Sequence, residues 1–168
     1  MTRPETLFAC PQVEIFASRN LLMLAWHEAP TVGVMREVAR AARTVARQHP
    51  AGSGVMNLFL RGTPRFTDEV RDEVVKIERD SSLFPLGVAR VILLPGLAGV
   101  AVRVFLNTVT LLARHTTRPV QAFGEVQEAA AWLAPKVSAG GEAWTAGEIV
   151  ALATPLLGAR TGQERGAA

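Results

Sequence analysis

Apolar residues along this chain recur with two different spacings, and the first short-period region predicts a β-hairpin. Val13–Ala17 and Leu21–Trp26 are short extended runs separated by Ser18, Arg19 and Asn20. Ser and Asn supply the turn chemistry that a hairpin needs. The second run is almost wholly apolar, which favours a place inside a sheet rather than at its edge.

The next part of the chain alternates predicted helices with a predicted strand. From Thr31 onward, apolar residues recur every three or four positions until Pro50, which predicts an amphipathic helix. Val55–Leu60 is the next predicted strand, and either Thr67 or Thr63 caps a second helix. The apolar residues expected to face inward from this second helix are Phe66, Val70, Val74 and Ile77.

The run Val91–Ala113 is apolar enough to resemble a membrane span. A spanning helix needs about 20 residues of nearly uninterrupted apolar character. Here a proline and two glycines lie near the start, and Arg103 falls in the middle. We therefore predict a buried strand over Val88–Leu94, a tight turn, and a helix from about Leu97 to Arg114.

This third helix is apolar around most of its circumference, although a helix on one face of a sheet needs only a single apolar stripe. We expect Val100, Val104 and Leu111 to be exposed on it and to form an interface with a partner or a second copy of the chain. A later apolar stripe either folds back over this helix, packs on its own domain or contacts a partner itself. That stripe contains Ile149, Leu152 and Leu156.

The chain closes its predicted sheet with a short strand, Pro119–Phe123, and a helix, Val126–Ala134. Strands that alternate with helices indicate parallel pairing, so we expect an α/β fold with a mixed five-stranded sheet, an N-terminal hairpin and about four helices. Residues 1–11 form an N-terminal arm and residues 12–137 the domain. Residues 138–168 comprise a linker, a short helix and a flexible tail, with mobility expected beyond Lys136.

This order of elements, together with Phe123 and the segment Glu128–Leu133, resembles the SpoIIAA-like branch of the STAS family. Members of that branch commonly end with a phenylalanine followed by an EA-x-x-WL helix. The resemblance covers roughly residues 12–134. It implies a compact domain without a cofactor that docks to regulatory partner proteins.

In some STAS proteins a Ser or Thr after a central strand is phosphorylated. The corresponding place here is Arg61–Pro64, where Thr63 is the only hydroxyl, so Thr63 is the candidate phospho-acceptor. The acidic neighbour of the family motif is absent. A threonine before proline also fits a helix N-cap with proline at the first helical position.

Charge and composition narrow the classes of partner. A net charge of +3 and an aromatic share of 6% argue against a nucleic-acid partner. A basic stripe on the outer face of the first helix would attract an acidic protein surface or anionic headgroups, unless it is simply a solvated face. Membrane contact is expected to be peripheral at most. The stripe consists of Arg36, Arg40, Arg43 and Arg47.

Cys10 is the only cysteine, which excludes an intramolecular disulfide and suits a reducing compartment. The N-terminal residues lack the apolar core of a secretory signal. We expect a location in a bacterial-type cytoplasm.

The chain presents few candidates for catalysis. His27, His49 and His115 are far apart in sequence and predict no metal site. His27 and Glu28 could form an acid/base pair in a cleft or a solvated strand end, and Pro95–Gly99 could bind an anion or allow close packing. We expect a non-catalytic docking domain without a cofactor. The alternatives are a module that binds a small ligand or lipid with the third helix as a pocket wall, or a peripheral membrane protein.

Overall fold

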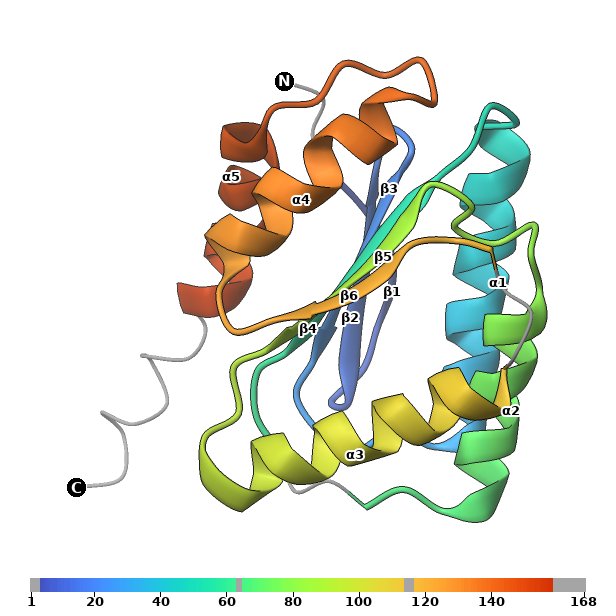
Figure 1. The fold of residues 1–168 in the computed structure, drawn as a ribbon, viewed down its shortest axis with the longest axis vertical. Helices are drawn as coiled ribbons and strands as arrows, with labels where there is room; N and C mark the ends of the chain where they lie inside the picture. The colour runs from blue at the N-terminus through green and yellow to red at the C-terminus, as the bar shows by residue number, and fades with distance from the viewer. Residues whose placement is uncertain (1–3, 63–64, 114–116, 159–168) are drawn as a thin grey trace.

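The computed structural model describes residues 4–62, 65–113 and 117–158, and it shows a mixed sheet between two layers of helices (Figure 1). The elements follow in the order β1 Glu5–Ala9, β2 Val13–Ser18, β3 Leu21–Trp26, α1 Val32–Gln48, β4 Gly54–Phe59, α2 Asp68–Arg79, β5 Gly87–Ile92, α3 Gly96–Leu112, β6 Val120–Phe123, α4 Val126–Ser138 and α5 Ala146–Gly158.

The six strands lie in the sheet in their sequence order, from β1 to β6. The first three pair antiparallel, and β3 to β6 pair parallel. The α/β class and the mixed sheet are confirmed, but the predicted count of five strands is wrong. The sixth strand is β1, which lies in the predicted N-terminal arm. This strand pairs only with β2, at the edge of the sheet. A register shift between Thr6 and Phe8 also interrupts the alternation of apolar and polar residues by which a strand is recognised in a sequence.

The central strands are buried on both faces because helices cover each face of the sheet (Figure 1). Val55 packs in the core with α1 and α2, while its neighbour Met56 packs in the core with α4 and α5. The threonine side chains at the two N-caps, Thr31 and Thr67, each accept a hydrogen bond from a backbone N–H three residues later, at 3.3 Å. Thr67 is thus the cap of α2, and Thr63 lies outside the described residues.

The run Val91–Ala113 contains the end of β5 and then α3, as predicted. Helix α3 lies beyond the carboxyl ends of the parallel strands (Figure 1) and packs against Ile92 and Phe59, the last residues of β5 and β4. Only a narrow stripe of this helix is buried, at Gly99, Val102, Leu106 and Val109. No helix in the described part of the chain combines the length and apolar character needed to cross a bilayer.

The C-terminal segment, for which mobility beyond Lys136 was expected, is part of the core at residues 137–158. Trp144, Ile149 and Leu156 are buried with α4 against the sheet, and Leu152 is half-buried beside them. Of the alternatives for this stripe, packing on its own domain describes Ile149 and Leu156, because this chain's own core covers them. Helix α5 lies beside α4 and leaves α3 uncovered (Figure 1).

Contacts from the hairpin turn between β2 and β3 hold the C-terminal segment, residues 137–158, in place. The Asn20 side chain donates to the Val137 carbonyl at 2.8 Å and accepts from Trp144 Nε1 at 2.9 Å. The guanidinium of Arg19 lies 3.5 Å from the centre of the Trp144 ring and pairs with Glu148 at 3.0 Å. Composition alone suggested a free linker, because these contacts join residues more than 100 positions apart.

Candidate functional site

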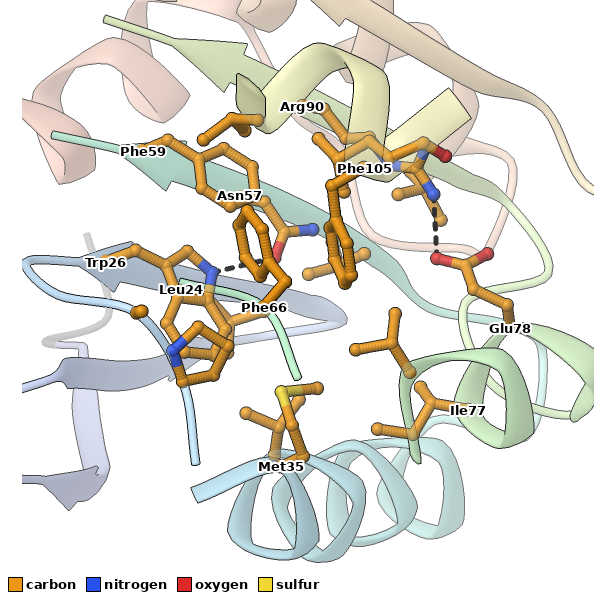
Figure 2. Close-up of a pocket in the computed structure, with 18 of the residues that line it drawn as sticks. Leu24, Trp26, Met35, Asn57, Phe59, Phe66, Ile77, Glu78, Arg90 and Phe105 are labelled. Carbon is orange, nitrogen blue, oxygen red and sulfur yellow. Dashed lines mark hydrogen bonds and ion pairs between the residues drawn. The ribbon is translucent and has the colours of Figure 1, made fainter. Parts of the chain in front are cut away.

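A cavity lies between the sheet and helices α1, α2 and α3 (Figure 2). It contains about 80 Å³ of space open to the centre of a water molecule, whereas a single water needs about 10–15 Å³. Most of its lining is apolar, so the space suits an organic molecule better than a chain of waters. The apolar lining includes Leu24, Trp26, Met35, Val38, Val55, Phe59, Phe66, Val74, Ile77, Val88, Val102, Phe105 and Leu106.

Two pairs of aromatic rings form walls of this cavity. Phe66, just before α2, stacks on Phe105 of α3 with ring centres 3.7 Å apart. Trp26 and Phe59, at the ends of β3 and β4, are nearly parallel with ring centres 6.4 Å apart. The first pair joins the segment before α2 to α3, so α3 closes the cavity at the carboxyl ends of the strands. Ligand sites of open α/β sheets commonly lie at this edge.

Two polar residues face the cavity from the middle of otherwise apolar strands. Asn57 of β4 and Arg90 of β5 are register partners, and Asn57 Oδ1 accepts a hydrogen bond from Trp26 Nε1 at 3.3 Å. Neither residue was among the candidates predicted from the sequence. The sequence did contain a signal for both, because each is a polar residue within an apolar strand. A buried polar group needs a specific partner, so such a residue marks a candidate site.

Arg90 belongs to a buried ion-pair cluster at one end of the cavity (Figure 2). Its guanidinium contacts Glu78 Oε1 at 2.8 Å and Thr110 Oγ1 at 2.8 Å. The other carboxylate oxygen of Glu78 pairs with Arg118, which also donates to the Leu83 carbonyl at 2.7 Å. The side chains of Arg90, Glu78 and Arg118 are 6%, 12% and 3% exposed, so all three charges lie inside the protein.

A shallower polar cleft shares part of its lining with the cavity. Both are lined by Glu28, Ala29, Arg61 and Gly62, and the cleft adds Pro11, His27 and Arg65. Of the two alternatives for His27 and Glu28, the geometry does not favour the acid/base pair, because His27 Nε2 contacts Glu14 Oε1 at 3.0 Å and Glu28 is exposed. The expectation of a solvated strand end therefore holds for Glu28 but not for His27, which is buried.

Gly62 sets the shape of the rim between cavity and cleft. Its φ of +104° is one that side-chain-bearing residues rarely adopt, and a Cβ there would lie 2.7 Å from Glu28 Cα and from the His27 carbonyl oxygen. This approach brings the end of β4 against the end of β3, so Arg61 and Glu28 line the same opening.

The other predicted site residues lie on separate surfaces. Val100, Val104 and Leu111 are 52%, 60% and 58% exposed on α3, as predicted, while the opposite side of that helix lines the cavity. The basic stripe is exposed on α1, where Arg40 pairs with Glu37. Its members are Arg36, Arg40, Arg43 and Arg47.

The remaining candidates for chemistry have structural explanations. A Cβ at Gly99 would lie 2.3 Å from the Leu94 carbonyl oxygen, so this glycine allows α3 to pack closely against the preceding loop. Within residues 4–62, 65–113 and 117–158, no group of three or more His, Cys, Asp or Glu side chains lies close enough to hold a metal ion.

Comparisons with protein families, with curated proteins and with solved structures give no match for this chain.

Proposed function

We propose that this chain is a ligand-binding module that takes a small, largely apolar organic molecule into the cavity beneath α3. One observation carries the proposal: an apolar space walled by Trp26, Phe59 and the Phe66–Phe105 stack shares its rim with a polar cleft. A few polar groups around an apolar pocket are typical of small-molecule sites. In this role α3 forms one wall of the pocket, as expected for the ligand-binding alternative predicted from the sequence.

A titration with a neutral aromatic probe tests this function. Benzamide, added to the ¹⁵N-labelled full chain, should shift the amide resonances of residues that line the cavity, such as Asn57 and Phe105. Residues of α4 and α5, on the opposite face of the sheet, should not respond. Absence of saturable shifts up to the solubility of the probe would contradict the proposal.

Two neighbouring positions on α3 provide a matched pair of variants. Val102→Phe adds a ring on the side that lines the cavity, so benzamide binding should be lost. Ala101→Phe adds the same ring on the exposed side and should bind as the wild type does. Val74→Phe fills the cavity from α2 and repeats the test if Val102→Phe does not fold.

A second candidate function is docking through the outer face of α3, the kind of role that the resemblance to STAS domains implies. The exposed apolar side chains on this helix favour it, and Leu97 alone is 88% exposed. We propose a second copy of this chain as the occupant. The outer stripe repeats at helical spacing without an acidic residue on α3, so two copies could pair their apolar stripes around a two-fold axis.

Light scattering across a range of protein concentrations tests this pairing. A dimer that dissociates on dilution is expected, and Val104→Asp should make the protein monomeric because it places a charge on the apolar stripe. Arg43→Asp changes the charge of an exposed residue on α1 and should leave the dimer intact. A wild-type chain that is monomeric at every concentration would contradict the pairing.

A further inference from the structure

The buried cluster of Glu78, Arg90 and Arg118 contains one more positive than negative charge. Among the described residues, Glu78 is the one carboxylate within ion-pair distance of either guanidinium. The other charged residues that line the cavity, Glu28 and Arg61, lie at its rim and are of opposite sign. The inner end of the cavity is therefore positive in a region where a charge without a partner is costly.

Arg118 also has a donor that nothing in the described chain uses. Its terminal nitrogens donate to Glu78 and to the Leu83 carbonyl, but its Nε is buried without an acceptor. Buried donors are nearly always paired, so the cluster lacks one acceptor as well as one negative charge, at a residue that lines the cavity.

Building on the proposed binding function, we infer that the ligand is an apolar organic acid whose carboxylate lies against Arg118 and Arg90. A carboxylate would balance the buried charge and supply the acceptor, and guanidinium groups suit its planar geometry. The apolar part would extend toward Trp26, at the other end of the cavity from the ion pair between Glu78 and Arg90 (Figure 2).

Three probes of one shape and different charge test this inference: benzoate, benzamide and benzamidine. Titrations at neutral pH should give a Kd for benzoate about ten-fold to one-hundred-fold below that for benzamide, as for hydrogen bonds to charged groups. Benzamidine, a cation, should bind more weakly than benzamide. The preference should change little between low and high salt, because the cluster is buried.

Single substitutions distinguish a carboxylate bound by the buried cluster from one bound by Arg65 in the adjoining cleft. Arg118→Met or Arg90→Met leaves Glu78 with one arginine and a neutral cluster, so the Kd for benzoate should rise to that for benzamide. Two such variants are used because either arginine can also be needed for folding, which circular dichroism will show. Arg65→Met removes an exposed charge from the adjoining cleft and should keep the preference.

The outcomes distinguish this inference from the function on which it rests. If benzamide binds and benzoate binds no better, the cavity is a ligand site and the acid specificity is wrong. If Arg65→Met abolishes the preference while both buried variants keep it, the carboxylate lies at the rim and the inference is also wrong. If no probe binds, both proposals fail.

Discussion

At the scale of single residues, one carboxylate joins three parts of the fold. Glu78, in the last turn of α2, holds Arg90 of β5 and Arg118, which precedes β6. Breaking a buried ion pair by removing one partner costs more than losing an exposed pair, since the remaining charge loses its compensation. Replacing Glu78 is therefore expected to lower the free energy of unfolding far more than replacing a glutamate on an exposed helix surface.

Replacing Glu78 by Gln should lower the free energy of unfolding by about 3–5 kcal/mol, because two buried guanidinium groups would lose their counter-charge. Urea denaturation measures this difference. Glu37→Gln is the control, since it removes an exposed pair with Arg40 worth about 0.5 kcal/mol or less. Equal effects of the two substitutions would show that the cluster contributes nothing beyond a surface ion pair.

Gly62 provides a second residue-scale prediction. Gly62→Ala should destabilise the chain by about 1–3 kcal/mol, because the added Cβ meets backbone atoms of His27 and Glu28, just after β3, and the positive φ becomes strained. Gly124→Ala is the matched control, since a Cβ there has no atom within 4 Å, and stability should stay the same or rise by up to about 1 kcal/mol. Thermal unfolding of both variants checks the comparison.

At the scale of elements, α3 and α5 are both apolar, but they lie in different environments. Helix α5 is packed by α4 and held by the hairpin turn, so Ile149 and Ala153 are fully buried. Helix α3 has one narrow buried stripe and several exposed apolar residues. The sequence pattern of each helix is similar, and only its neighbours determine which apolar residues are covered.

Ile149→Ala should therefore cost about 2–5 kcal/mol, the usual range for truncation of a large apolar side chain in a core. Leu97→Ala, on the exposed side of α3, should change stability by less than about 0.5 kcal/mol. Chemical denaturation gives both values. A small effect of Ile149→Ala would mean that α5 is not part of the folded core in solution.

At the scale of the whole molecule, the two helical layers share one sheet. Adjacent residues of the central strands contribute to both cores, so neither layer can separate without exposing the other side of the same strands. We expect the chain to unfold as one cooperative unit, including residues 137–158.

Coincident unfolding curves are the test of this cooperativity. Trp26 lies in the core beneath α1 and α2, and Trp144 in the core with α4 and α5. Trp132 also packs against the core with α4 and α5, so both variants are made in a Trp132→Phe background. The fluorescence of Trp144 in Trp26→Phe and that of Trp26 in Trp144→Phe should each follow the far-ultraviolet circular dichroism of the same variant through a single transition. A separate early transition reported by Trp144 would show that the C-terminal layer unfolds on its own.

Features that depend on the local spacing of residues were predictable from the amino-acid pattern alone. The period of apolar residues located α1, α2 and the strand before each helix, and the interruptions in Val91–Ala113 distinguished β5 and α3 from a membrane span. These predictions succeeded because helix and strand periodicity, caps and turns act over a few residues. The exposure of Val100, Val104 and Leu111 followed from the same reasoning, since a helix on a sheet can bury only one stripe.

Features that depend on contacts between residues distant in sequence could be seen only in the folded chain. The edge strand β1, the burial of α5 by the turn at Asn20 and the cluster around Glu78 each join segments whose own patterns are weak or ambiguous. The cavity arose in the same way, from three helices and the ends of three strands. Periodicity shows which side of an element is apolar, but the chain's long-range packing determines whether that side meets protein, solvent or an enclosed space.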